Sequence, residues 1–302
     1  RLLKRVRQGV YHGLAWMSTV PSPGDASPGA FWSPRFGHPA RLEVGRMFRF
    51  FRRRRRERIL SEPFPPEWRR MLRRDAAVLR ALPEDHWKRL EDDLRLFMAE
   101  RDWEPCGGLR EREEMRVLIA AQACLLTLGR SVDAFDHVRT ILLYPARYVA
   151  REAVEDELGV VTEDLDDREG EAWERGQVVL SWSEVSADAK RADGRNLVLH
   201  EFAHQIDLLD FLDGARPAPQ DRERFARWRE TFMGAFDTFA DAVDRGKKVR
   251  VLDPYGAEDE AEFFAVSTEA FFERPSDLKR HYPDLYALLT EYFALDPAAW
   301  TW

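Results

Sequence analysis

The chain of 302 residues is poor in cysteine and contains no long apolar run. Its two cysteines, Cys106 and Cys124, form neither a disulfide framework nor a cysteine-based metal site, so we expect reduced thiols and a cytoplasmic location. No stretch reaches the roughly 18 apolar residues that a membrane-spanning helix needs, so we expect no membrane partner. The hydrophobic content of 44% is nevertheless ordinary for a globular protein.

Positive charge is concentrated at the start of the chain. Residues 1–58 carry 14 of the 47 Lys and Arg residues but only three of the 54 acidic ones. The rest of the chain therefore carries 33 basic and 51 acidic residues, a net charge of −18. Because an acidic body repels nucleic acid, we expect no nucleic-acid partner. We interpret the run Arg52–Arg56 as a solvated terminal segment rather than a site for nucleic acid or anionic lipid.

The first residues differ in composition from a folded domain. Residues 20–40 are rich in Pro, Gly and Ser, which is typical of disorder. We expect residues 1–60 to form a disordered basic extension, with translation beginning near Met47. Residues 61–302 are expected to form a single catalytic domain with a helical N-terminal part.

The segment NLVLHEFAHQID, residues 196–207, combines metal-binding residues with an apolar helical pattern. Residues four apart on an α-helix lie about 40° apart around its axis, so His200 and His204 project from one face. Two imidazoles at this spacing suit one Zn²⁺ ion, and Glu201 between them suits a general base acting on water. An unpaired His or Glu is costly in such apolar surroundings, which favours metal binding over coincidence. The motif predicts a zinc-dependent peptidase.

A catalytic zinc site needs a third protein ligand. Asp210 lies six residues after the second histidine, but no glycine is placed where the helix could turn back toward the metal, so Asp210 is a minor candidate. Farther along, a predicted helix carries Glu258, Glu262 and Glu269 near one stripe. Spacing does not choose among the three, although Glu262 lies in the most apolar part of this helix.

Three segments resemble the Mlc titration factor A family of bacterial zinc peptidases. They are GEAWERGQVVLSW at residues 170–182, NLVLHEFAHQIDLLD at 196–210 and DPYGAEDEAEFFAVSTEAFF at 253–272. Their order and separation also fit the family, so the resemblance covers the chain from about residue 47 onward. The chain is more distantly similar to the catalytic domain of anthrax toxin lethal factor.

The resemblance implies a role for particular residues. In the family a Tyr-Gly pair precedes the ligand Glu by seven residues, as Tyr255 precedes Glu262 here. It therefore implies one zinc ion held by His200, His204 and Glu262, the ligand set of a gluzincin. Tyr255 is implied as an active-site hydroxyl, beside Glu201 as the general base expected from the motif.

The residues that would orient these ligands are less clear from the sequence. Thermolysin-like enzymes carry an Asp four residues after the ligand Glu, where this chain has Val266. Metal ligands need outer partners that fix their orientation. Asp207, three residues after His204, is one substitute, and an ordinary exposed helix residue is an equally good interpretation of it.

The sequence as a whole predicts a mainly helical α+β protein, zincin-like, with a small mixed sheet beside the zinc helix. Apolar spacing predicts helices over 67–82, 84–99, 111–128, 221–244, 258–275 and 276–293. It predicts strands over 137–144 and 177–182, a turn at 100–109 and a loop with hairpin character at 154–174. The resemblance implies a sheet edge above the zinc helix, where an extended peptide can add as a strand.

Two functions of different classes are compatible with these features. The first is hydrolysis of a peptide or protein substrate, and the resemblance implies aminopeptidase activity. The second, also implied by the resemblance, is sequestration of Mlc, a transcriptional repressor of sugar-uptake genes. Sequestration does not require the metal, whereas proteolysis does. A zinc hydrolase acting on a non-peptide amide would use the same residues.

Overall fold

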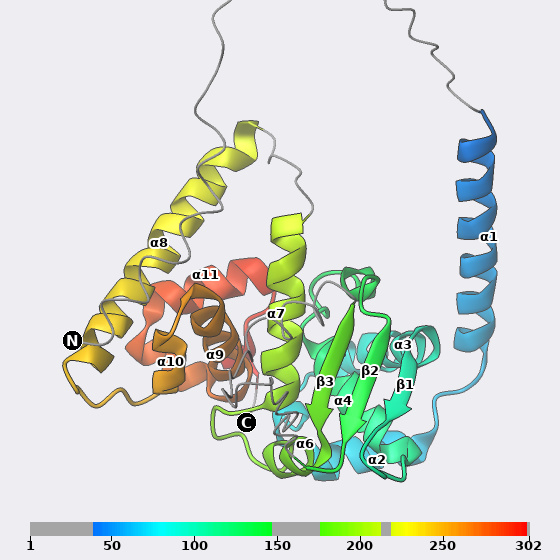
Figure 1. Ribbon diagram of the computed structural model, residues 1–302, viewed down its shortest axis with the longest axis horizontal. Coiled ribbons are helices and arrows are strands. Elements are labelled where there is room, and N and C mark those ends of the chain that lie inside the picture. Colours follow the sequence, from blue (N-terminus) through cyan, green and yellow to red (C-terminus); the bar gives the residue numbers. More distant parts are fainter. Residues whose placement is uncertain (1–38, 147–175, 213–218, 301–302) are drawn as a thin grey trace, which may run out of the picture. The chain divides into compact units, whose positions relative to one another are not determined.

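The computed structural model describes residues 39–146, 176–212 and 219–300, and the side chains of residues 39–49, 207–212 and 219–225 lie outside the description. Contacts divide the chain into two compact units, Arg1–Phe50 and Phe51–Trp302. The second unit contains the sheet and the helices that surround it (Figure 1).

The second unit is a mainly helical α+β fold, as the sequence predicts. The helices are α1 (Pro39–Ser61), α2 (Pro66–Asp75), α3 (Glu84–Glu100), α4 (Glu113–Leu125), α6 (Trp182–Asp188), α7 (Leu197–Leu212), α8 (Pro219–Asp244), α9 (Glu260–Glu273), α10 (Pro275–His281) and α11 (Pro283–Phe293). Short 3₁₀ turns are η3 (Ala77–Leu79), η4 (Val132–Phe135), η5 (Pro254–Ala257) and η6 (Pro297–Ala299). The strands are β1 (Asp102–Pro105), β2 (Thr140–Tyr144) and β3 (Gln177–Ser181). None of the helices in the described ranges combines the length and apolarity needed to cross a bilayer.

The described strands form one parallel sheet in the order β1-β2-β3 (Figure 1). Parallel neighbours need a crossover connection, and α4 lies in the one that joins β1 to β2. β3 is at the edge of the described sheet and packs beside α7. A mixed sheet was predicted, but the described strands are all parallel. Residues 147–175, which include the loop predicted at 154–174, lie outside the description.

The segment 100–109, predicted as a turn, contains the strand β1 and then a turn at Gly107 and Gly108, so the prediction holds only for its second half. β1 exposes Asp102, Glu104 and Pro105, residues with little intrinsic preference for a strand. Its backbone pairs in parallel with residues 140–143 of β2, at the edge of the sheet. Pairing with a neighbour, which local composition does not reveal, therefore decides the conformation of this segment.

The helix predicted over 276–293 consists of two helices. Pro283 lacks a backbone N–H and disfavours a helical conformation in the residue before it, so α10 ends at His281 and α11 begins at Pro283. Tyr282 between them has φ −135° and ψ 63°, outside the helical region. The helix predicted over 67–82 likewise stops at Asp75 and is followed by η3. The other predicted helices and both predicted strands are confirmed, with shifts of a few residues at their ends.

The second half of α1 belongs to the Phe51–Trp302 unit. Arg56 donates from Nε and Nη2 to the two carboxylate oxygens of Glu100, each at 2.7 Å. Arg52 donates to Glu100 at 3.3 Å and also to Asp136. Two members of the arginine run thus pair with acidic residues of the body. The division between an extension and a domain at residue 60 otherwise stays a prediction.

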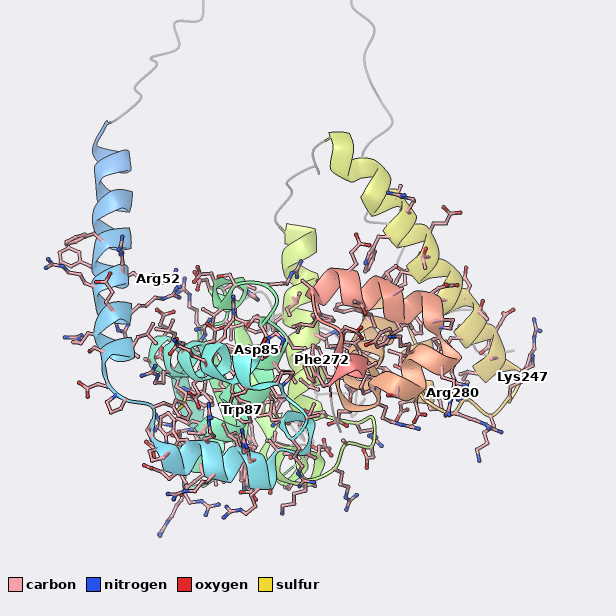
Figure 2. The ribbon with its side chains drawn as sticks, turned by 180° about the vertical axis from the view of Figure 1, so that it is seen from behind. Arg52, Asp85, Trp87, Lys247, Phe272 and Arg280 are labelled. Atoms are coloured by element: carbon pink, nitrogen blue, oxygen red, sulfur yellow. The ribbon has the colours of Figure 1, made fainter. Side chains whose placement is uncertain are left out.

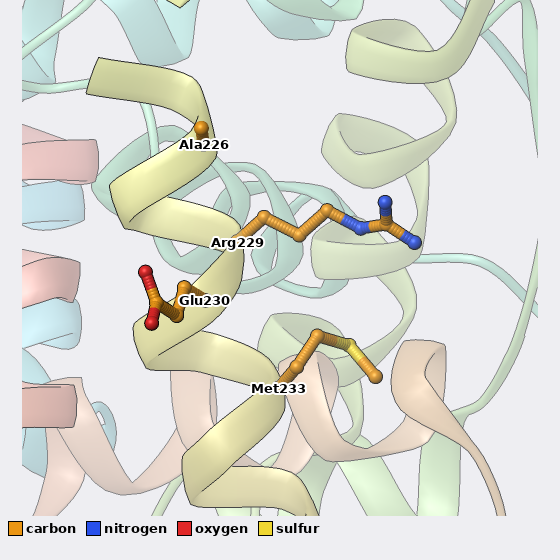
Figure 3. A pocket seen from close by; sticks show the side chains of 4 residues that line it. All are labelled: Ala226, Arg229, Glu230 and Met233. Atoms are coloured by element: carbon orange, nitrogen blue, oxygen red, sulfur yellow. The ribbon is translucent and has the colours of Figure 1, made fainter. Parts of the chain in front are cut away.

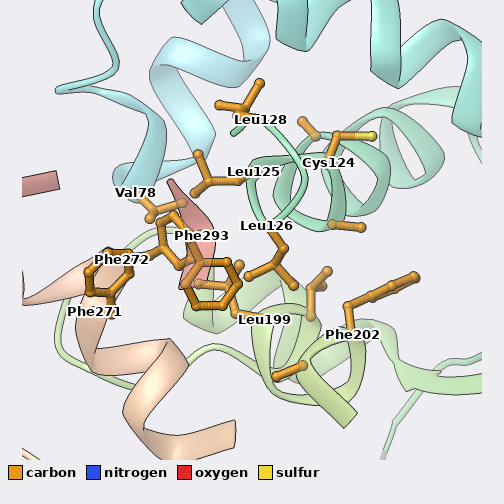
Figure 4. Packing of buried hydrophobic residues seen from close by; sticks show 14 of the residues in the cluster. Val78, Cys124, Leu125, Leu126, Leu128, Leu199, Phe202, Phe271, Phe272 and Phe293 are labelled. Carbon is orange, nitrogen blue, oxygen red and sulfur yellow. The ribbon is translucent and has the colours of Figure 1, made fainter. Parts of the chain in front are cut away.

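A continuous buried core joins α7 to the helices around it. Phe202 of α7 meets Phe97 of α3 and Phe135 of η4 edge-on, with ring centroids 5.6 and 5.0 Å apart. Figure 4 shows Leu199 and Phe202 in one buried cluster that also includes Cys124 and Leu125 of α4 and Phe293 of α11. Because these side chains are fully buried and closely packed, they fix both the position and the rotation of α7.

Helix α9 packs between α7 and α8 and is buried along most of its length. From α8, Phe232 and Phe239 contact Phe263 with ring centroids 5.3 and 5.4 Å away. Phe232 and Phe239 therefore belong to the buried core. Carboxylates on a helix as buried as α9 need partners, because an isolated buried charge is costly.

Candidate metal centre

The first turn of α7 is fixed by its cap and by packing. Oδ1 of Asn196 accepts a hydrogen bond from the backbone N–H of Leu199 at 3.1 Å, the usual geometry of an asparagine cap. His200 and His204 lie on the following turns. Because Leu199 and Phe202 are anchored in the core, both imidazoles are directed toward α9.

The first turn of α9 is fixed in the same way. Asp259 caps the helix by accepting a hydrogen bond from the backbone N–H of Glu262 at 2.8 Å. Glu262 is the third residue of α9, where the helix dipole stabilises a negative charge. Burial raises the pKa of Glu262, but contacts with His200, His204 and Tyr255 outweigh burial and lower it. The carboxylate is therefore ionised at neutral pH.

Three donor atoms from these two helices converge on one point. His200 Nε2 lies 3.2 Å from His204 Nε2 and 3.1 Å from Glu262 Oε2, and His204 Nε2 lies 3.6 Å from Glu262 Oε1. Ligands bonded to a tetrahedral zinc at about 2.0–2.1 Å lie about 3.3 Å from one another. The observed spacing is that of a metal ligand set, so this cluster could hold a metal ion.

The charges of the cluster also fit a cation. Glu262 Oε2 is buried and has no well-directed hydrogen bond within the described residues. Burial lowers the pKa of His200, but Glu262 and Glu269 outweigh burial and raise it to about 10. Burial and the neighbouring His200 lower the pKa of His204 to about 4. A proton on His200 thus occupies the place where a divalent cation would satisfy the lone pairs of all three donors.

Glu269 orients the first histidine from behind. One of its carboxylate oxygens lies 2.8 Å from His200 Nδ1, so a proton on Nδ1 leaves the lone pair of Nε2 directed toward the cluster. Metal-binding histidines commonly donate their other N–H to a carboxylate in this way. Of the three ligand candidates predicted on this helix, Glu262 lies in the cluster and Glu269 lies behind it. Glu258 is exposed and outside the cluster.

Behind Glu269 is a buried polar network that the sequence reasoning missed. The backbone N–H of Asn196 donates to Glu269, and Nδ2 of Asn196 donates to Gln122 Oε1 at 2.7 Å and to Glu273 Oε1 at 2.9 Å. Glu273 also accepts from the backbone N–H of Gly194 at 2.9 Å. The network joins α4, α7 and α9 at the base of the histidine pair. An Asn directly before an apolar helix is a typical cap signal, but nothing local indicated its partners.

The absence of an Asp at position 266 has a packing explanation. A Cβ atom added to Gly256 would lie 3.2 Å from Cβ of Val266 and 3.4 Å from Cα of Phe263. The turn η5 therefore packs directly on α9, and the close approach brings Tyr255 to the cluster. The carboxylate that orients His200 comes instead from Glu269, later on the same helix. The side chain of Asp207, the predicted substitute, lies outside the described residues, as does that of Asp210.

Tyr255 and Glu201 border the three donors. The ring of Tyr255 has its centroid 6.2 Å from that of His200, and a hydrogen bond from Tyr255 contributes to the lowered pKa of Glu262. The side chain is 47% exposed, so a substrate can reach it. Glu201 is half-buried, and its negative charge contributes to the raised pKa of His200. The structure thus brings His200, His204 and Glu262 into one cluster, with Tyr255 beside it.

Two surface pockets lie away from this cluster. One, of about 420 Å³, is lined by Ala226, Arg229, Glu230 and Met233, all on α8 (Figure 3). The other, also of about 420 Å³, is lined by residues 248–251 and by residues of α10 and its start. Neither includes a residue of the donor cluster. The candidate catalytic site is therefore identified by the metal-binding atoms of His200, His204 and Glu262 and not by the volume of a cavity.

Comparison with known proteins leads to the same chemistry. The sequence model of the family described as glucose-regulated metallo-peptidase M90 matches residues 50–294, a range that contains the whole donor cluster. The chain belongs to the M90 metallopeptidase family. Membership of this family confirms the resemblance noted from three short segments.

Several relatives of this M90 protein span most of its length. It is 33% identical over 245 residues to an uncharacterized protein of Synechocystis sp., which covers 80% of this chain and 89% of that protein. It is 32% identical over 223 residues to Mlc titration factor A of Edwardsiella ictaluri, covering 73% of this chain and 84% of the relative. It is 29% identical over 223 residues to Mlc titration factor A of Pectobacterium atrosepticum, covering 74% and 84% respectively.

Proposed function

We propose that this M90 protein is a zinc-dependent metallopeptidase of the gluzincin type, in which His200, His204 and Glu262 hold one zinc ion. The observation that supports this most strongly is the cluster of metal-binding atoms, in which the two Nε2 atoms lie 3.2 Å apart and the Glu262 carboxylate lies 3.1 Å from His200 Nε2 through Oε2 and 3.6 Å from His204 Nε2 through Oε1. Two nitrogens and one carboxylate at tetrahedral spacing suit zinc. Magnesium and calcium instead take six or more oxygen ligands, so they fit the set poorly.

The residues around this cluster supply the other parts of a hydrolytic site. A bound zinc would act as a Lewis acid toward the scissile carbonyl and make water more acidic. Glu201 takes a proton from the attacking water and gives it to the leaving amine. Tyr255 donates a hydrogen bond to the carbonyl oxygen as negative charge develops there. Glu269 accepts a hydrogen bond from Nδ1–H of His200 and so directs Nε2 toward the metal position.

The proposed substrate is an extended peptide or protein segment. β3 lies at the edge of the described sheet and beside α7, and its residue Val179 is 43% exposed. An edge strand can bind a peptide through main-chain hydrogen bonds. We also propose aminopeptidase activity, which the family resemblance implies. We propose a cytoplasmic location as well, which the two free cysteines support.

The test compares metal content with turnover. Glu201→Gln should retain one equivalent of zinc by elemental analysis and lose peptide hydrolysis, whereas His204→Ala should lose both. Glu230→Gln, an exposed change on α8, is the matched control and should keep both. Mass spectrometry of the products distinguishes release of N-terminal residues from internal cleavage. If Glu201→Gln hydrolyses peptides as fast as the unmodified protein, Glu201 is not the general base.

A second function is supported by the name of two relatives, Mlc titration factor A. We propose that the chain also binds a transcriptional repressor of the Mlc type and that binding does not need the metal. The test measures repressor binding by calorimetry before and after treatment with a chelator. Equal affinities support binding independent of zinc, and loss of binding with the metal contradicts it.

A further inference from the structure

A second chemically distinctive surface lies at the C-terminal end of α9. Its pocket of about 420 Å³ is lined by four cations, Lys248, Arg250, Arg274 and Arg280, with Asp277 and His281, and with Val249 and Val251. Only one carboxylate faces the four permanent positive charges. Residues 59–302 carry a net charge of −18, so this basic pocket is opposite in sign to the body that contains it.

The floor of the basic pocket is rigid. Arg274 donates to Asp277 Oδ2 from Nε at 3.2 Å and from Nη2 at 2.6 Å, and from Nη1 to the backbone oxygen of Arg250 at 3.1 Å. Its Cδ packs so closely on Gly194 that a Cβ there would be 3.0 Å away. Arg280 donates to the second oxygen of Asp277 at 2.6 Å. Asp277 is thus fully engaged in holding two guanidinium groups in place.

The rim of the basic pocket is open to solvent. Lys248 and Arg250 are exposed, and neither side chain makes an ion pair with a described residue. Arg280 is 69% exposed and keeps donors directed outward. Figure 2 shows Arg280 and the neighbouring Lys247 extending away from the ribbon. The hydrogen-bonded Arg274 in the floor and the exposed cations at the rim form a surface suited to several carboxylates at once.

The composition of the pocket favours protein over nucleic acid as the partner. No Phe, Tyr or Trp lines it and His281 is its one aromatic ring, although stacking on aromatic rings is the usual means of binding single-stranded nucleic acid. The acidic body around it repels a long polyanion but tolerates a short acidic segment. Two valines in the lining offer apolar contact to the backbone and side-chain stems of a peptide.

The position of the pocket relates it to the metal centre. Arg274 lies twelve residues after Glu262, at the end of α9, which corresponds to about 18 Å along the helix axis at 1.5 Å per residue. An extended peptide covers that distance with about five or six residues at 3.4 Å each. The separation along the helix axis is therefore within the length of a short extended segment.

We propose that the basic pocket is a docking surface for an acidic segment of a protein bound by this chain, rich in Asp and Glu. The segment places its carboxylates against Lys248, Arg250 and Arg280 on the fixed floor made by Arg274. Binding at this surface needs neither the metal nor catalysis.

The test is fluorescence anisotropy with a fluorescein-labelled peptide of six glutamates and the full-length protein. Lys248→Glu/Arg250→Glu should weaken binding by about tenfold or more at low salt, because two attractive contacts become repulsive. Arg53→Glu/Arg54→Glu is the matched control, since it makes the same change of charge in the other basic region, and it should alter Kd by less than about twofold. Thermal unfolding of both variants checks that they remain folded.

Three outcomes overturn the proposal. The first is no saturable binding of the peptide by the unmodified protein. The second is a Kd of Lys248→Glu/Arg250→Glu equal to that of the unmodified protein. A loss of affinity in Arg53→Glu/Arg54→Glu as large as that in the pocket variant counts in the same way. The third is tighter binding of a labelled oligonucleotide of the same charge than of the peptide, together with loss of that binding when Lys248→Glu/Arg250→Glu replaces the unmodified protein. Because the assay uses no turnover, a protein that binds the peptide but hydrolyses nothing would contradict only the proposed function.

Discussion

A carboxylate oxygen of Glu269 lies 2.8 Å from Nδ1 of His200, on the opposite side of the ring from the donor cluster. Glu269 and Glu262 are seven residues apart on α9, so one helix supplies both a candidate ligand and the group that orients another ligand. His200 is held between them, with its two nitrogens facing two different carboxylates. This arrangement directs Nδ1 of His200 to Glu269 and leaves Nε2 facing the donor cluster.

Removal of the charge behind His200 should weaken metal binding. We expect Glu269→Gln to lower zinc affinity by about 10- to 100-fold, because an amide is a poorer acceptor than a carboxylate for Nδ1–H. Competition with a chromogenic chelator measures this affinity. Glu260→Gln, an exposed change in the first turn of the same helix, should leave it unaltered. Equal affinities for the two variants would mean that Glu269 does not orient the ligand.

Tyr255 should act on turnover rather than on the metal. Loss of its hydroxyl in Tyr255→Phe should reduce kcat by about a hundredfold, since one donor to the developing oxyanion is removed. KM and zinc content should change little. Tyr282→Phe, at a half-buried tyrosine between α10 and α11, serves as the control. If zinc content falls in parallel with kcat, Tyr255 supports the ligands and does not act on the substrate.

Glu273 should make the protein less stable as pH rises. Burial and the neighbouring Glu269 raise its pKa from 4.5 to about 8, although Asn196 and Gly194 donate to it. The folded protein therefore holds a proton that the unfolded chain releases above its ordinary pKa, and this stabilisation is complete below pH 4.5 and is lost as pH rises through about 8.

The comparison that isolates this effect uses Glu273→Gln, which stays neutral at every pH. The melting temperature of the unmodified protein should fall relative to that of the variant between about pH 5 and pH 9, measured by circular dichroism with a chelator present. Other titrating groups are common to both proteins and cancel in the difference. A difference that is constant with pH would contradict a raised pKa for Glu273.

The pairing of Arg56 with Glu100 should stabilise the attachment of α1. Arg56 is 19% and Glu100 11% exposed, and the contact is bidentate, so a double-mutant cycle with alanine should give about 1–2 kcal/mol of coupling. The exposed pair Arg53–Glu57 on the same helix, 81% and 58% exposed, should give only about 0.3–0.5 kcal/mol. Urea unfolding measures both cycles. Equal coupling in the two pairs would show that the arginine run is only solvated.

Local patterns were sufficient for part of the fold. The apolar periodicity of α7 and α9 was visible in the sequence because these helices are buried on most sides. β1 was not visible, because its four residues adopt a strand only through pairing with β2. The split between α10 and α11 depends on Pro283, whose effect on the residue before it was underestimated.

The sequence by itself determined that the imidazoles of His200 and His204 share one face of an apolar helix, because the period of the α-helix converts spacing directly into direction. It also narrowed the third donor to three glutamates on one stripe. Only the tertiary structure decided that Glu262 completes the cluster while Glu269 lies behind His200, and that Arg52 and Arg56 pair with acidic residues far along the chain. Those choices depend on how two helices are rotated against each other, which is set by the packing of distant side chains and is not encoded in any short segment.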